Sequence, residues 1–367
     1  MHEVGDFPPC SRPAAGTRRK PAVTSGLGAR ARITGHVLLV PLVVTLLLAA
    51  GPAATATASP GARPRSPAPS DAGTPLDPED FAPGACEAFS PTSGNRHRTV
   101  FLDAGHGGID PGGVGSTESG ATITEAAQTL PTELDTMALL RSQGFGVVVS
   151  RTRQTNVVRL GPQDVSDGVL TLQGALDDVA ARDECANLAQ ADILIGIYYD
   201  AGASPDYAGS MSAYDPDRPF AAQSKRLATL VQTDVLGAMN AHGWQIPDDG
   251  VLPDNTLGSL VPTSSTGGLA EAALNYDHLL LLGPAEQGYF STPSDMPGTV
   301  VEPLYVTDPF EGTIAASTTG QQAVALGIDQ AVLAYFAPAP RTAHRADATG
   351  PHGAARPSGE SARRDRQ

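Results

Sequence analysis

The sequence predicts a single α/β domain, built on a mostly parallel, twisted sheet with helices on both faces. Short apolar runs rich in Val, Ile and Leu alternate along the chain with longer amphipathic stretches, which is the pattern of strands alternating with helices. The apolar runs are nearly continuous, as expected of strands that are buried on both faces of a sheet. These two observations carry the fold class.

The expected elements follow one another in a regular order. The first strand ends in turn-forming residues, and the first helix contains Pro131 as an expected kink and is closed by Gly144. Chemistry in such sheets collects at the carboxyl ends of the strands. Strands are expected over 99–105, 145–152, 192–201, 209–215, 278–284 and 299–306, and helices over 123–144, 172–191, 220–243 and 319–336.

Both ends of the chain differ in composition from its centre. Residues 1–58 are interpreted as a secretory signal with a long basic leader, in which an apolar run precedes the small residues Ala56 and Ala58 of a cleavage site. An uncleaved membrane anchor is the alternative. Residues 59–84 are rich in Pro, Ala, Ser and Gly and are expected to form a linker, and 338–367 a disordered basic tail. The folded domain is then expected over 85–337.

The expected domain is strongly acidic. Residues 85–336 contain 30 Asp and Glu against 10 Lys and Arg, a formal charge of −20, whereas the whole chain carries −15. Nucleic-acid binding needs clustered positive charge, so this balance argues against a nucleic-acid partner. It is compatible with a neutral polymer or a bound cation, and a solvated acidic surface is the simpler alternative.

The chain has three cysteines, Cys10, Cys86 and Cys185. Cys10 belongs to the leader, which leaves an even pair in an oxidising compartment. We therefore predict a disulfide between Cys86 and Cys185. A cysteine nucleophile is the rival interpretation, but neither residue stands in a motif that pairs a thiol with a base.

Residues that could carry chemistry stand at three expected strand ends. His106 follows the first strand, in VFLDAGHGGIDPGG; Tyr198 and Asp200 close the third; Glu302 lies in the last. Glu125, near the start of the first helix, could return beside His106 through the glycine-rich loop between them. A histidine and a carboxylate are two of the three N and O ligands typical of a catalytic zinc. Taken singly, His106 could instead bind the loop backbone and Glu125 could favour the helix N-terminus.

Together these residues resemble a known family. VFLDAGHGGIDPGGVG resembles the opening motif of the zinc-dependent N-acetylmuramoyl-L-alanine amidases, which are bacterial cell-wall hydrolases. The segments TEAAQTL, GFGVVVSRT, ARDECANLAQADILIGIYYDA and MPGTVVEPLY follow in the family's order with compatible spacing. The resemblance covers most of the expected domain.

The resemblance implies His106 and Glu125 as zinc ligands and Glu302 as the general base. The implied reaction is hydrolysis of the amide between N-acetylmuramic acid and L-alanine of the peptidoglycan stem peptide. Zinc would polarise the carbonyl and activate water, and Glu302 would take the proton and deliver it to the leaving amine. Asp103 and Asp110 would lie behind the ligands, because ligand histidines usually give their other N–H to an acceptor.

The third ligand departs from the family pattern. Where the family has Ser-Ile-His, this chain has Gly196, Ile197 and Tyr198, so the resemblance implies Tyr198 as a phenolate ligand. The ordinary pKa of tyrosine is ~10, and the metal must supply the difference. Asp200 and His278 are the alternative third ligands, although Asp200 could equally cap a turn and His278 could stand at a strand edge.

Two functions are therefore expected from the sequence. The first is a secreted peptidoglycan amidase that contacts stem peptide and glycan, holds one zinc ion and keeps no stable membrane anchor after signal cleavage. The second is a catalytically silent amidase-like domain that binds wall fragments or regulates another hydrolase. The presence of Glu302, together with His106 and Glu125, favours the enzyme.

Overall fold

The structure, a computed structural model, describes residues 72–257 and 276–338. The expected signal segment and nearly all of the expected tail lie outside these residues. The chain separates into two compact units, Met1–Tyr335 and Phe336–Gln367, and the fold belongs to the first. In the described ranges, no helix combines the length and the apolar character that crossing a membrane requires.

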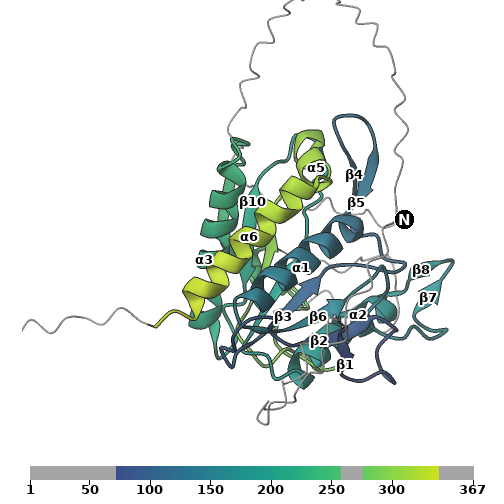
Figure 1. The fold of residues 1–367 in the computed structure, drawn as a ribbon. Coiled ribbons are helices and arrows are strands. Elements are labelled where there is room, and N and C mark those ends of the chain that lie inside the picture. Colours follow the sequence, from purple (N-terminus) through teal and green to yellow (C-terminus); the bar gives the residue numbers. More distant parts are fainter. Residues whose placement is uncertain (1–71, 258–275, 339–367) are drawn as a thin grey trace, which may run out of the picture. The chain divides into compact units, whose positions relative to one another are not determined.

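A mixed sheet forms the centre of the first unit (Figure 1), and in the described residues its strand order is β1-β2-β6-β3-β9-β12-β10-β11. The four central strands, β6, β3, β9 and β12, run parallel to one another. At the margins, β2 and β10 run antiparallel to their inner neighbours. The α/β prediction is confirmed. The bounds are β1 Thr74–Pro75, β2 Ala85–Phe89, β3 Thr99–Ala104, β6 Gly146–Arg151, β9 Ile193–Ile197, β10 Ser210–Tyr214, β11 Asp248–Pro253 and β12 Gly298–Glu302.

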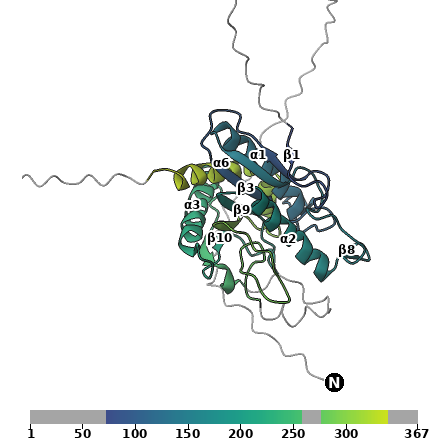
Figure 2. The same ribbon diagram turned by 90° about the horizontal axis from the view of Figure 1, so that it is seen from below.

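Helices cover both faces of the sheet, as predicted. Helices α1 and α3 pack against one face and α6 packs against both of these helices, whereas α2 lies on the other face (Figures 1 and 2). The four expected helices are all present, with ends shifted by a few residues. Their bounds are α1 Glu125–Ser142, α2 Leu172–Leu188, α3 Ala221–Asn240 and α6 Thr318–Tyr335, and a short α5 spans Pro309–Ala315.

The strand expected over 278–284 is wrong. Leu279 and Gly283 instead close a turn, in which the Gly283 amide donates to the Leu279 carbonyl at 2.8 Å. Leu279, Leu281 and Leu282 are buried in the same core cluster as Val300 of β12. These leucines therefore lose their exposure by packing onto a sheet, which an apolar run alone does not distinguish from strand pairing.

The folded part begins before Ala85, inside the expected linker. Thr74 and Pro75 form β1, a short edge strand that pairs with β2. Phe81 is 1 % exposed and forms a backbone bridge with Val158. The linker prediction fails for residues 72–84 because this one aromatic side chain anchors a segment whose overall composition is that of a linker.

The predicted disulfide is confirmed. Cys86 of β2 is bonded to Cys185 of α2, with 5.6 Å between their Cα atoms, and both residues are fully buried. The bond ties the antiparallel margin of the sheet to the helix that covers this face.

Candidate active site

The carboxyl ends of β3, β9 and β12 bring His106, Tyr198 and Glu302 to one edge of the sheet. In the register of β3, β9 and β12, Ala104 pairs with Ile197, and Ile197 pairs with Val301. The next residues along these strands are Gly105, Tyr198 and Glu302. Residues in register on parallel strands project from the same face, so Tyr198 lies between Gly105 and Glu302.

His106 and Glu125 face each other, as expected. His106 Nε2 lies 3.0 Å from Glu125 Oε2. A two-stranded hairpin, β4 Val114–Ser116 and β5 Thr122–Thr124, carries the chain from the histidine loop back to Glu125, the first residue of α1. The Gly113 amide donates to Glu125 Oε1 at 2.7 Å, which fixes the carboxylate with its other oxygen toward the imidazole.

The loop holds His106 from its other side as well. Asp110 Oδ2 lies 2.9 Å from His106 Nδ1, in the arrangement that orients metal-binding histidines. A Cβ at Gly112, whose φ is +65°, would come within 2.3 Å of the imidazole, so only glycine fits there. Burial lowers the pKa of His106, but the hydrogen bonds to Asp110 and Glu125 outweigh burial and raise it to about 10.

Tyr198 stands at the position expected for the third ligand, but its hydroxyl is hydrogen-bonded to a carboxylate of the chain. The hydroxyl donates to Asp103 Oδ2 at 2.9 Å, and its ring meets the His106 ring edge-on, with 5.4 Å between centroids. The ring also covers Gly105, where a Cβ would lie 2.1 Å from it. Burial and the charge of Asp103 raise the pKa of the Tyr198 hydroxyl well above its usual value.

A buried ion network supports the histidine loop from below. Arg182 of α2 donates to Asp103 Oδ1 at 2.5 Å and to Asp178 Oδ2 at 2.8 Å. The same guanidinium donates to the backbone carbonyls of Ala104 and His106 at 3.1 and 2.8 Å. Arg182 therefore joins the end of β3, the histidine loop and α2 in one rigid unit.

A second buried group behind the site is Glu133 of α1. Its Oε1 accepts from the Ala104 amide at 3.0 Å, and its Oε2 has no hydrogen-bond partner within the described ranges. Burial raises the pKa of Glu133 to about 8. Sequence reasoning missed this residue, because a glutamate inside an amphipathic helix reads as part of its polar face.

The structure places the two alternative third ligands differently. Asp200 extends the pairing of β9 with the segment after β12: its amide donates to the Leu304 carbonyl at 3.0 Å, and its carbonyl accepts from Val306 at 2.8 Å. Its backbone thus lies at the same sheet edge as His106.

The structure does not bring His278 to the His106–Glu125 pair. The imidazole of His278 contacts Asp215 at 3.0 Å, and Asp215 directly follows β10. Because β10 is antiparallel to β12, with Met211 opposite Glu302, Asp215 lies at the opposite edge of the sheet. Burial and the charge of Asp215 raise the pKa of Asp254, another carboxylate that contacts His278, to about 6.

The described residues fit a catalytic zinc at two of the usual three protein positions. His106 and Glu125 converge, whereas in the described part of the chain no third His, Cys, Asp or Glu brings a ligand atom within 4.8 Å of both. To fill the third position, Tyr198 must release Asp103 and lose its proton.

Comparison with known proteins identifies the family of the chain. A family model described as N-acetylmuramoyl-L-alanine amidase matches residues 100–334. The chain is similar to N-acetylmuramoyl-L-alanine amidase AmiA of Salmonella typhimurium, with 26% identity over 249 residues that cover 65% of this chain and 76% of the relative. It is also similar to the germination-specific N-acetylmuramoyl-L-alanine amidase of Bacillus subtilis, with 25% identity over 38% of this chain and 52% of that protein.

One similarity to a solved structure is also found. The CwlD amidase from Clostridioides difficile, in complex with the GerS lipoprotein, superimposes with a TM-score of 0.47 at 19% identity, covering 65% of this chain and 98% of that one. The family match spans well over half of the chain and contains His106, Glu125, Tyr198 and Glu302. The chain therefore belongs to the N-acetylmuramoyl-L-alanine amidase family of hydrolases.

Proposed function

We propose that this amidase is an exported, zinc-dependent enzyme that cleaves the bond between N-acetylmuramic acid and L-alanine in peptidoglycan. The observation that carries the proposal is the 3.0 Å approach of His106 Nε2 to Glu125 Oε2, at the carboxyl edge of a parallel sheet where such chemistry collects. Membership of the family, over residues 100–334, supports the substrate class.

Each proposed metal ligand is held by a second group of this chain. Asp110 Oδ2 lies 2.9 Å from Nδ1 of His106, which leaves Nε2 of the imidazole for the metal. The Gly113 amide donates to Oε1 of Glu125, which leaves Oε2 for the metal. When bound, zinc supplies a Lewis acid for the scissile carbonyl and acidifies the attacking water. Preorganisation of this kind lowers the cost of ordering the ligands when the metal binds.

Glu302 is the proposed general base. It ends β12 beside Tyr198 and is half-buried, so its carboxylate stands at the sheet edge that His106 follows. A base there takes the proton of the attacking water and delivers it to the amine of L-alanine as the amide breaks. One carboxylate thereby serves both proton transfers.

Tyr198 is the proposed third ligand, at an energetic cost that a histidine would avoid. Coordination replaces its 2.9 Å hydrogen bond to Asp103 and requires a phenolate, which burial and the Asp103 charge disfavour. We infer that zinc is held more weakly here than by a set with two histidines and one glutamate.

Export is proposed from the leader-like residues 1–58 and from the disulfide between Cys86 and Cys185. Disulfides form and persist in oxidising compartments, and peptidoglycan lies outside the cytoplasm. The strongly acidic domain suits a largely uncharged glycan better than a polyanion.

The product chemistry tests the proposal directly. Purified peptidoglycan is incubated with the zinc-supplemented protein, and new α-amino groups and new reducing sugar ends are counted separately. An amidase releases stem peptides with N-terminal L-alanine and creates no reducing ends. The His106→Ala variant is expected to release none. New reducing ends, or stem peptides cut between amino acids, would contradict the proposal.

A further inference from the structure

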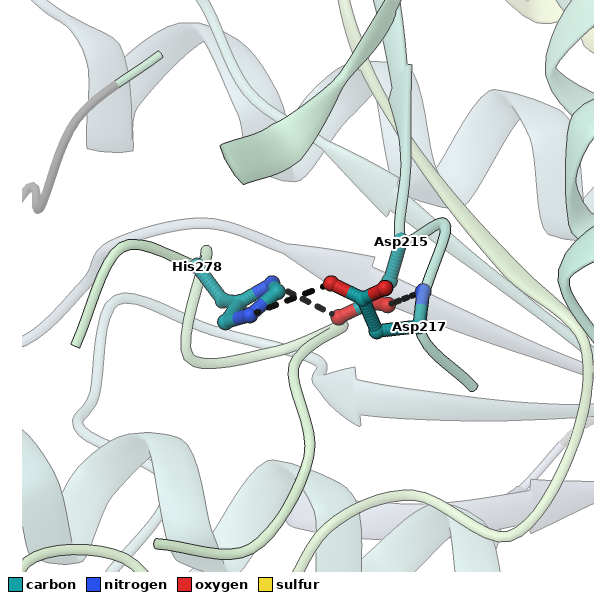
Figure 3. A group of neighbouring side chains, drawn as sticks. All are labelled: Asp215, Asp217 and His278. Carbon is teal, nitrogen blue, oxygen red and sulfur yellow. Dashed lines mark hydrogen bonds and ion pairs between the residues drawn. The ribbon is translucent and has the colours of Figure 1, made fainter. Parts of the chain in front are cut away.

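A second group of polar side chains lies at the opposite edge of the sheet from His106 (Figure 3). Asp215 and Asp217 follow the end of β10, and His278 lies in the turn that follows residues 258–275. A fourth member, Asp254, begins a short 3-10 helix, η1 Asp254–Thr256, after β11. Three segments distant in sequence thus meet at one point.

The contacts converge on the His278 imidazole. Its Nδ1 lies 3.0 Å from Asp215 Oδ2 and 3.2 Å from Asp254 Oδ1, and its Nε2 lies 3.8 Å from Asp217 Oδ2. Ligand atoms of Asp215, Asp217 and His278 all lie within 4.8 Å of one another. Figure 3 shows the two carboxylates and the imidazole turned toward a common space. One cation could touch all three.

One buried oxygen of this group makes no hydrogen bond. Asp215 is 2 % exposed, and within the described residues its Oδ2 has no hydrogen-bond partner. It lies 3.0 Å from Nδ1 of His278, which also faces Asp254 and carries at most one proton. Burying a carboxylate without full pairing is costly, and a cation in the common space would remove that cost.

Asp254 is placed to orient the histidine. It is fully buried, its Oδ2 accepts from the Leu279 amide at 3.1 Å, and its Oδ1 lies on Nδ1 of His278. A carboxylate on one ring nitrogen fixes the tautomer whose other nitrogen binds a metal. Asp217 is 60 % exposed in its side chain, so an ion can enter from solvent.

We propose that Asp215, Asp217 and His278 form a second divalent-cation site, with Asp254 as the residue that positions His278. One imidazole nitrogen with carboxylate oxygens suits Zn²⁺ or Mn²⁺ better than Ca²⁺, which prefers six to eight oxygens. The ion would tie the end of β10 to the segments on both sides of residues 258–275. Because this site lies at the opposite edge of the sheet from His106, its role is structural and it takes no part in hydrolysis.

A titration that separates the two sites tests the proposal. Zn²⁺ binding and thermal unfolding are measured on the full chain in an His106→Ala background, which removes the proposed catalytic ion. One Zn²⁺ per chain and a higher melting temperature with Zn²⁺ are expected. Asp217→Asn should weaken this binding at least tenfold, as should His278→Ala. Asp277→Asn, which removes an exposed charge next to His278, is the matched control and should change neither.

Several results would overturn the second site. One is that the His106→Ala protein is folded but binds no Zn²⁺ or Mn²⁺; another is that Asp217→Asn binds as tightly as its parent. A rise in melting temperature with Ca²⁺ but not with Zn²⁺ would contradict the assigned metal class. Because Asp217 is exposed, its variant is expected to fold even if His278→Ala does not. None of these outcomes bears on amidase activity.

Discussion

The hydroxyl of Tyr198 donates to Oδ2 of Asp103 at 2.9 Å, and the same Asp103 binds Arg182 through its other oxygen. The residue at the third corner of the proposed zinc site is therefore tied into the buried ion network that supports the histidine loop. The strength of metal binding then depends on how readily Tyr198 leaves this network.

Restoring a histidine at position 198 is expected to tighten zinc binding. Tyr198→His supplies a neutral nitrogen ligand, whereas Tyr198→Phe removes the oxygen and keeps the ring over Gly105. Relative to the parent, we expect a Kd for zinc at least tenfold lower for the histidine variant and at least tenfold higher for the phenylalanine variant. Residues that only hydrogen-bond to a metal ligand already change metal affinity ~10–100-fold. Titration in an Asp217→Asn background isolates this site. Equal affinities for Tyr198→Phe and the parent would exclude Tyr198 as a ligand.

Truncating Arg182 is expected to destabilise the domain strongly. Arg182→Ala leaves the buried carboxylates of Asp103 and Asp178 without their cation, and breaking a buried pair costs about 3–5 kcal/mol. Urea denaturation measures the loss. Arg226→Ala removes an exposed arginine that also donates to two carbonyls and should cost far less. Similar losses for the two variants would show that the network contributes little.

Glu133 is expected to make stability depend on pH. Its pKa is raised from 4.5 to about 8 by burial, so between these values the folded protein keeps a proton that the unfolded chain releases. The free energy of unfolding should therefore fall as pH rises through this window. Denaturation of Glu133→Gln at several pH values should show a smaller fall, whereas exposed Glu118→Gln should match the parent. A Glu133→Gln curve parallel to that of the parent would contradict the buried, protonated state.

The disulfide is expected to contribute measurably to stability. Cys86 and Cys185 are 99 residues apart in sequence, and removing a native disulfide typically costs about 2–5 kcal/mol. The double variant Cys86→Ala/Cys185→Ala should show this loss in chemical denaturation. Thiol titration of the denatured, unreduced protein provides the check, and free thiols at both positions would rule out the bond.

Much of the central sheet could be predicted because its strands are continuous apolar runs followed by turn residues. β3, β6, β9 and β12 and the four long helices have this signature. The margins could not be predicted in the same way. β2 is a short strand interrupted by Glu87, and β11, Asp248–Pro253, lies in a stretch rich in Asp, Gly and Pro that is typical of a loop. Its pairing with the neighbouring β10 makes it a strand.

The candidate site also has a part that could be predicted from the sequence and a part that could not. His106 and Glu125 could be brought together from motif and spacing, because both lie where chain direction fixes them. The hydrogen bond of the Tyr198 hydroxyl could not be predicted, since it depends on Asp103 and Arg182, which come from two other elements. His278 is an alternative third ligand in the sequence because its leucine run suggests a strand next to the one that carries Glu302. As a turn residue it lies instead with Asp215, which the sequence marks only by an Asp-Pro-Asp after a strand.

The rate of the zinc-loaded Glu302→Gln variant tests the central claim most directly. Muramyl-peptide hydrolysis is measured for the parent and the variant at matched zinc content, with thermal unfolding as the check on folding. The account predicts unchanged zinc binding and a fall in kcat of about 10²–10⁴-fold, the usual contribution of a general base. A Glu302→Gln protein that binds zinc and hydrolyses the amide at the parent's rate would contradict it, and a parent that binds zinc without any hydrolysis would favour the silent, wall-binding alternative.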